Sequence, residues 1–338
     1  MADESAELNN DVTPFILLLA TSEGLVIAEK GDRGWDQVRT FLSDRKITSI
    51  IAEADLILVG TQKGIYRSQD SGLSWEGDNS SLSQYHIRWL DKNTETGICF
   101  AGTEPASIFY SIDKGRHWNT CPEVAEMRQL YGWSLPYSPE AGCVRGFAFN
   151  RHQVFAAVEV GGVLLSNDDG RSWQLVEGSG GLPDHKSQEG RIHPDVHSIA
   201  TSFQSQSPGL VIAPTGGGLY RSSDAGKSWM QIHSRCYCRA VWIDPIDPDR
   251  LIFGPAEGVD YNGRIESSRD GGQNWHSATN GLDTPWRHYM VERFYQFSQE
   301  LFAVLSNGAL ISTHIDDIHW SRILPDVGKI HALAALPV

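Results

Sequence analysis

Short apolar runs recur along the chain. Each is followed within a few residues by a glycine turn and a second apolar run. The clearest example is Leu56 to Thr61, which only two residues separate from the run Gly64 to Arg67. Short runs of apolar and β-branched residues bounded by glycine are typical of strands, and two such runs this close together predict a β-hairpin. The 33 Gly, 15 Pro and 11 Trp residues also favour strands and turns over helices. The pattern therefore predicts an all-β protein.

An eight-residue motif, Ser-x-Asp-x-Gly-x-x-Trp, follows these hairpins five times. The copies are Ser68 to Trp75, Ser111 to Trp118, Ser166 to Trp173, Ser222 to Trp229 and Ser268 to Trp275. The Ser and Asp oxygens can accept backbone N–H bonds across a tight turn, Gly supplies a positive φ, and Trp packs between sheets. We therefore expect the five Asp residues to be structural and to lie on the face opposite any active site.

Two weaker copies end at Trp35 and Trp320, which makes seven copies in all. Successive tryptophans are 40, 43, 55, 56, 46 and 45 residues apart. A repeat of about 48 residues with four short strands is typical of propeller blades. The first copy begins directly at Phe15 to Ala20, and one strand, Lys329 to Leu333, is left over after the last copy. We therefore predict a single seven-bladed β-propeller of four-stranded blades, in which the C-terminal strand completes the first blade and closes the ring.

The predicted domain covers residues 13–338, and residues 1–12 are expected to form a flexible acidic N-terminus. The seven motifs resemble those of the Asp-box, or BNR-repeat, propeller proteins. That superfamily includes sialidases, glycosidases that cleave xyloglucan oligosaccharides, sortilin-type receptors and a photosystem II assembly factor. The resemblance implies the fold and leaves hydrolase, receptor and assembly roles open. A typical sialidase is disfavoured, because no Phe-Arg-Ile-Pro segment occurs near the N-terminus.

Charge and composition exclude several classes of partner. The net charge of −14 argues against binding to nucleic acid and to anionic membrane surfaces. No apolar segment approaches the ~20 residues of a membrane span, so membrane insertion is not expected. Five scattered cysteines indicate a reducing, cytoplasmic location, and Cys236 and Cys238 are expected to be buried structural thiols.

Alignment of the seven innermost strands places a polar residue at the same position in each, between apolar neighbours. These residues are Thr48, Arg88, Arg145, His197, Arg239, Glu292 and His331. In a propeller they would form a ring around the central channel, on the face that carries the connections between blades. Arginine forks in an acidic protein point to a small anionic ligand, such as a carboxylate or uronate. We expect Arg88, Arg145 and Arg239 to bind it, together with Glu159 and Asp195.

The first functional hypothesis is a hydrolase or lyase that acts on this anionic substrate. His197, His331, Glu292 and Tyr237 are its candidate catalytic residues, as acid–base groups and donors. A second hypothesis is a non-catalytic scaffold or assembly factor that binds a protein partner. A third is a divalent metal site formed by His197, His331 and Glu292; no other cofactor is expected.

Whether the three arginines are paired with carboxylates distinguishes these hypotheses. Unpaired arginines in a cavity of several hundred cubic ångströms would favour a ligand site. If Arg88, Arg145 and Arg239 were all neutralised by carboxylates that join one blade to another, the scaffold would be favoured, because the ring would then only connect the blades.

Overall fold

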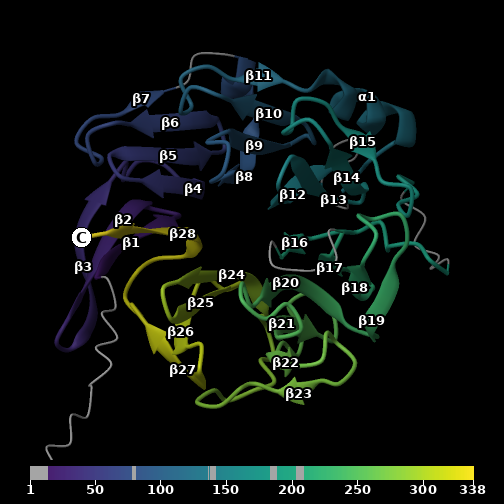
Figure 1. Ribbon diagram of the computed structural model, residues 1–338. Helices are drawn as coiled ribbons and strands as arrows, with labels where there is room; N and C mark the ends of the chain where they lie inside the picture. Colours follow the sequence, from purple (N-terminus) through teal and green to yellow (C-terminus); the bar gives the residue numbers. More distant parts are fainter. Residues whose placement is uncertain (1–13, 78–80, 136, 138–141, 183–188, 203–208) are drawn as a thin grey trace, which may run out of the picture.

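The computed structural model confirms a ring of seven four-stranded antiparallel sheets around a central channel (Figure 1). It describes residues 14–77, 81–135, 137, 142–182, 189–202 and 209–338. The predicted N-terminal segment 1–12 lies outside the described residues. Strands make up most of the regular structure, and no helix in the described part of the chain is long and apolar enough to cross a membrane.

Blades 1 to 4 follow one another from the N-terminus, and in each blade the first strand named lies at the channel and the last lies outermost. Blade 1 consists of β28 (Ile330–Pro337), β1 (Phe15–Thr21), β2 (Gly24–Gly31) and β3 (Gly34–Phe41). Blade 2 consists of β4 (Ile47–Glu53), β5 (Leu56–Thr61), β6 (Gly64–Ser68) and β7 (Glu76–Gly77). Blade 3 consists of β8 (His86–Lys92), β9 (Cys99–Glu104), β10 (Ile108–Ser111) and β11 (Asn119–Thr120). Blade 4 consists of β12 (Cys143–Asn150), β13 (Gln153–Glu159), β14 (Gly162–Ser166) and β15 (Gln174–Leu175).

The remaining three blades complete the ring. Blade 5 consists of β16 (Ala200–Thr201), β17 (Val211–Thr215), β18 (Gly218–Ser222) and β19 (Met230–Ser234). Blade 6 consists of β20 (Tyr237–Ile243), β21 (Leu251–Ala256), β22 (Glu266–Ser268) and β23 (His276–Ser277). Blade 7 consists of β24 (Val291–Phe297), β25 (Glu300–Leu305), β26 (Leu310–His314) and β27 (Asp317–Ile323). Two short helices lie in connections between blades, η1 (Ser81–Gln84) and α1 (Pro122–Tyr131), and α1 was not expected from the sequence.

The hydrophobic core lies between neighbouring blades. The middle strands are covered by sheets on both sides, which explains why β5 and β14 are buried along their whole length and read as continuous apolar runs. Between blades 3 and 4, for example, Phe100 packs against Phe147, and Phe147 packs against Trp173. The outermost strands face solvent, as in β3, whose central residues are exposed.

The ring closes as predicted. Strand β28 pairs antiparallel with β1, in a register that runs from Phe15 opposite Pro337 to Thr21 opposite Ile330. The first blade is therefore assembled from both ends of the propeller domain, and β28 supplies its innermost strand.

The repeat motifs form tight turns at the outer ends of the third strands, as the motif at Ser222 to Trp229 shows. The Asp224 carboxylate accepts hydrogen bonds from the Ser228 backbone N–H at 2.9 Å, from its hydroxyl at 2.6 Å and from Ser222 Oγ at 2.8 Å. Gly226 donates its N–H to Ser222 Oγ and adopts a φ of +84°. These contacts lie at the far end of the blade from the start of its inner strand, because successive strands are antiparallel.

Replacement of the Asp224 carboxylate is expected to destabilise the fold without changing any site in the channel. In Asp224→Ala, one backbone N–H and two hydroxyl donors lose their partner, which costs about 1–2 kcal/mol. Urea unfolding measures the change in the free energy of unfolding. Ser223→Ala is the matched control, since this exposed neighbour is expected to change stability by less than about 0.5 kcal/mol. Equal stability of the two variants would contradict the structural role of the carboxylate.

Candidate functional site

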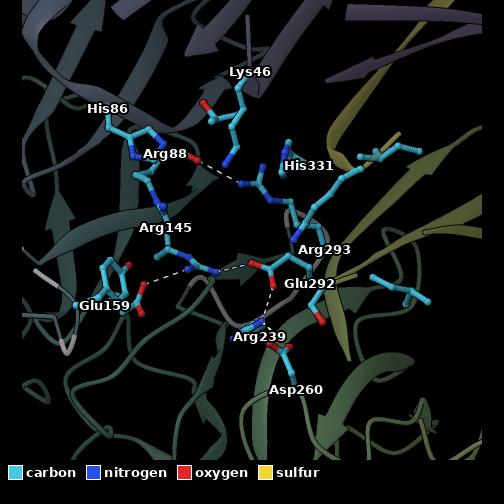
Figure 2. Close-up of a pocket in the computed structure, with 16 residues that line it drawn as sticks. Lys46, His86, Arg88, Arg145, Glu159, Arg239, Asp260, Glu292, Arg293 and His331 are labelled. Atoms are coloured by element: carbon cyan, nitrogen blue, oxygen red, sulfur yellow. Dashed lines mark hydrogen bonds and ion pairs between the residues drawn. The ribbon is translucent and has the colours of Figure 1, made fainter. Parts of the chain in front are cut away.

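A cavity of about 400 Å³ opens at one end of the central channel. Figure 2 shows that its wall is made of polar side chains from several blades that point toward one another. Most of these residues lie at the beginning of the inner strands β4, β8, β12, β20, β24 and β28, and the rest lie in turns on the same face. The predicted face therefore carries the cavity.

Irregular strand pairing directs the ring side chains into the channel. In each of β4, β8, β12, β20, β24 and β28, the register with the next strand shifts at the ring residue, so that this residue has no direct partner. In β12, for example, Val144 pairs with Val158 and Gly146 with Ala157, which leaves Arg145 between them. A bulge of this kind adds one residue to a strand and changes the direction of a side chain.

One part of the wall is a closed network of ion pairs. Glu292 bridges two blades, because its carboxylate accepts from Arg145 at 2.7 Å and from Arg239 at 2.8 Å. Arg145 also pairs with Glu159 at 3.0 Å, and Arg239 pairs with Asp260 at 3.1 Å. Burial alone would raise the pKa of Glu292, but the guanidinium groups of Arg145 and Arg239 outweigh it and hold that pKa at about 2. These groups therefore stay charged and mutually neutralised at neutral pH.

Arg88, the third predicted arginine, is also paired. Its guanidinium lies 3.4 Å from the carboxylate of Glu104 at the end of β9. All three arginines expected to clamp an anion thus already have carboxylate partners. Glu292 joins Arg145 and Arg239 to another blade, whereas Glu104 belongs to the same blade as Arg88.

The opposite part of the wall has an excess of positive charge. Lys46, Arg293 and Lys329 line the cavity, and within the described chain none of them forms an ion pair with a carboxylate. We call these three residues the cationic side. Arg293 extends from β24 to blade 3, where it donates to the Arg88 carbonyl oxygen at 3.2 Å (Figure 2). Its guanidinium also lies 4.0 Å from the ring centre of Trp89.

Two histidines lie beside the cationic side and remain neutral. Burial and the positive charges of Lys46 and Lys329 lower the pKa of His331 to about 4, and its Nε2 is 2.9 Å from Ser22 Oγ. Burial, Arg88 and Lys46 lower the pKa of His86 to about 4 as well. Each imidazole can therefore donate a hydrogen bond to a ligand or accept one from it, but it adds no charge of its own at neutral pH.

Three predicted site residues lie outside the cavity wall. His197 is almost completely buried, its Nε2 is 3.3 Å from the Asp195 carboxylate, and its ring packs 4.8 Å from that of Tyr237. Burial raises the pKa of Tyr237 to about 12, so its hydroxyl stays protonated. The structure does not place these three side chains among those that line the cavity, and their roles toward a ligand stay predictions.

The predicted metal set is also not assembled. His197 lies with Glu159 and Asp195, whose ligand atoms are all within 4.8 Å of one another, and not with His331 and Glu292. In the described residues this is the one group of such spacing. Arg145 already neutralises Glu159 in this group, and a bound cation would have to displace that guanidinium or lie beside its charge.

Sequence reasoning missed the cationic side, although part of the signal was present. Lys46 and Lys329 stand two residues before the ring positions Thr48 and His331, and alternate residues of a strand share one face. Arg293 follows Glu292 directly and would face away in a regular strand. Only the bulge in β24 allows both neighbours to reach the cavity.

The wall as a whole suits an anion better than a cation. It contains six lysine and arginine side chains and three carboxylates among the described residues, within a protein of net charge −14. All three carboxylates are already bound by arginine, whereas the ammonium groups of Lys46 and Lys329 can donate to a ligand.

Comparison with known proteins supports the fold more strongly than any activity. No family model matches the chain. The photosystem II assembly lipoprotein Ycf48 of Synechococcus sp. (strain CC9902) is 21% identical over 240 residues, which is 68% of this chain and 62% of that protein. The match thus spans less than two thirds of the curated relative.

Solved structures of two functional kinds share the fold. A structure of YCF48 bound to D1 peptide has a TM-score of 0.60 and 15% identity, and the match covers 91% of this chain and 94% of that one. The GH74 xyloglucanase from Xanthomonas campestris has a TM-score of 0.62 and 15% identity over 95% of this chain and 54% of that one. These likenesses support the predicted fold: this chain is a seven-bladed β-propeller, and it shares that fold with the YCF48 structure and with part of the GH74 xyloglucanase.

Proposed function

We propose that this protein is a non-hydrolytic binding propeller whose channel cavity receives a carboxylate or similar anionic group on a small molecule or a peptide. The observation that carries the proposal is the cationic side, where Lys46, Arg293 and Lys329 have no carboxylate partner within the described residues. An anion there would replace water around three positive charges and form charge-assisted hydrogen bonds.

The state of the acidic groups supports binding over hydrolysis. Glycoside hydrolysis generally needs one carboxyl group that is protonated near neutral pH and one free carboxylate. Burial opposes ionisation of Glu159, but Arg145 and His197 outweigh it and lower its pKa, and the pKa of Glu292 is about 2. Neither carboxylate in this part of the wall can therefore serve as a general acid.

A lyase is the second candidate, and one observation favours it. His331 is neutral at physiological pH and lies beside the cationic side, so it could accept a proton from a carbon next to a bound carboxylate. Its low pKa makes it a weak base, which is why we place binding first.

A protein partner would offer the same chemistry through an acidic side chain or a free C-terminus. YCF48 has been solved with a D1 peptide, and that likeness of fold supports a peptide as one source of the anion. A small organic acid or a uronate is the other source, and the binding experiment distinguishes the two.

Removal of one ammonium group from the cationic side is expected to weaken anion binding about tenfold, since a charge-assisted hydrogen bond contributes about 1.5 kcal/mol or more. Calorimetric titration of the wild-type chain with organic acids, galacturonate and acidic peptides ending in a carboxylate identifies the ligand. Galactose and peptide amides are the neutral counterparts. Lys46→Ala and Lys329→Ala should then each lower the affinity.

Lys63→Ala is the matched control, because Lys63 is an exposed lysine in the β5–β6 turn and does not line the cavity. Binding of galactose and galacturonate with equal affinity, or unchanged affinity in Lys46→Ala, would contradict the proposal. A ligand that is turned over by the wild type but not by His331→Gln would favour the lyase instead.

A further inference from the structure

A second cluster of reactive side chains lies away from the channel cavity, between blades 5 and 6. Cys236 stands between β19 and β20, and its Sγ is 3.2 Å from Nδ1 of His233. The opposite ring nitrogen, Nε2, is 3.1 Å from the carboxylate of Glu266 on β22. None of these residues lines the channel cavity.

The imidazole is held in one orientation from three directions. Arg264 donates to the other oxygen of Glu266 at 2.6 Å, and so fixes the carboxylate that binds Nε2. The ring also packs against Phe253 at 5.0 Å and against Trp275 at 5.8 Å. A thiol, a base and a carboxylate that orients the base form the arrangement that activates nucleophiles. It is not a metal cluster, because the thiol and the carboxylate lie at opposite nitrogens of the same ring.

The electrostatics agree with this geometry. Hydrogen bonds from Cys238 and His233 outweigh the effect of burial and lower the pKa of the Cys236 thiol to about 6. The hydrogen bonds to Cys236 and to Glu266 raise the pKa of His233 to about 9. The pair is therefore a thiolate and an imidazolium at neutral pH. Burial instead raises the pKa of Cys99 to about 11 and that of Cys121 to about 12.

We propose that Cys236 is a redox-sensitive thiolate that reacts with a small peroxide, with His233 as its proton donor and Glu266 as the residue that positions His233. The thiolate attacks one oxygen of hydrogen peroxide, and the O–O bond breaks as an S–O bond forms. Sulfur is oxidised by two electrons to a sulfenic acid and the peroxide is reduced. The leaving hydroxide takes the proton of the His233 imidazolium and departs as water.

The surroundings restrict both the oxidant and the product. Cys236 is only 5% exposed, so a molecule of the size of hydrogen peroxide is a suitable oxidant and a bulky disulfide is not. Cys238 is near enough to interact with the Cys236 sulfur. Its thiol can condense with the sulfenic acid to form a disulfide and release water.

The five cysteines of one molecule provide the first test. The wild-type chain is exposed to a brief pulse of hydrogen peroxide at pH 7, treated with catalase and denatured in dimedone, and each cysteine peptide is quantified by mass spectrometry. Cys236 is expected to be oxidised at least ~10-fold faster than Cys99 and Cys121, since the thiolate is the reactive form. Either a trapped sulfenic acid or a disulfide to Cys238 supports the proposal. Oxidation of Cys236 no faster than of Cys99 and Cys121 would overturn it.

The pH dependence of the oxidation rate shows whether Cys236 reacts because its thiol is activated or only because it is accessible to peroxide. In the wild type the oxidation rate of Cys236 should stay nearly constant from pH 8 down to about pH 6 and fall below it. His233→Gln should lower the rate at pH 7 about tenfold or more and move the profile toward the ordinary range of a thiol. Glu266→Gln should move the profile in the same direction.

His276→Gln is the matched control, because His276 is exposed on β23 and contacts neither Cys236 nor Glu266 in the structure. Thermal unfolding of each variant verifies that it is folded. If the oxidation rate of Cys236 in His233→Gln depended on pH as it does in the wild type, the role of the imidazole would be contradicted.

Discussion

Deletion of residues 330–338 is expected to abolish cooperative folding of the propeller. Strand β28 pairs with β1 along its length and buries Ile330, Leu333 and Leu336 between blades. Burial of each such side chain contributes about 1.5–3 kcal/mol, so their removal costs roughly 5–9 kcal/mol before any hydrogen bond is counted. That sum is comparable to the total stability of most domains, about 5–15 kcal/mol.

The loss is measured by the thermal unfolding transition of the chain 1–329, followed by circular dichroism. Addition of a synthetic peptide of residues 329–338 should restore a cooperative transition, because the empty position beside β1 offers a complete row of backbone partners. A peptide with Leu333→Asp should not restore it. A wild-type midpoint for the chain 1–329 would show that closure by β28 contributes little to stability.

Glu292→Gln is expected to destabilise the folded protein by about 3 kcal/mol. The substitution keeps the size of the side chain but leaves Arg145 and Arg239 in the wall without the negative charge that links them. Removing one partner of a buried ion pair typically costs about 3–5 kcal/mol, and the side chain of Glu292 is 22% exposed, which places the cost at the lower end. Asp249→Asn is the control, since its pair with Arg221 is largely exposed and should contribute less than about 1 kcal/mol.

The pH dependence of stability provides an independent measure of the same interaction. The folded state lowers the pKa of Glu292 from 4.5 to about 2, so the stabilisation is complete above about pH 4.5 and is lost as the pH falls toward 2. Urea unfolding at several pH values should therefore show a steeper acid loss in the wild type than in Glu292→Gln. Parallel curves for the two proteins would mean that Glu292 is not held by the arginines.

The expected functional class is revised by the pairing of the arginines. Arg88, Arg145 and Arg239 were expected to bind a substrate, yet each already has a carboxylate partner. The anion site that we propose uses other cations, Lys46, Arg293 and Lys329. Residue type alone could not separate the two sets, because an arginine is available to a ligand only if no carboxylate of its own or another blade reaches it.

The cluster of Cys236, His233 and Glu266 also could not be identified from residue types and spacing. The spacing of Cys236 and Cys238 matches no strong redox motif, and His233 has no distinguishing pattern in the sequence. The imidazole comes from β19 of blade 5 and the thiol from the connection to blade 6, whereas Glu266 comes from the third strand of blade 6. Only the packing of those blades brings the three groups together.

The sequence by itself determined the architecture of this protein. The number of blades, their four strands and the closure by the last strand follow from a repeat that can be counted seven times along the chain, and the positive φ of the motif glycines follows from its five intact copies. Local turn chemistry and strand periodicity act over a few residues, so they can be read from the chain directly. The polar ring was visible for the same reason, as one position in each inner strand.

Only the tertiary structure decided which ring residues are free to act. The bulges that direct Arg145 and Glu292 into the channel depend on pairing with a neighbouring strand, and their ion pair joins positions 147 residues apart. His197 is buried against Tyr237 and Asp195, and Arg293 reaches the cavity because its own strand bulges. Charge neutralisation and burial are properties of the assembled ring, since they depend on the distances between blades.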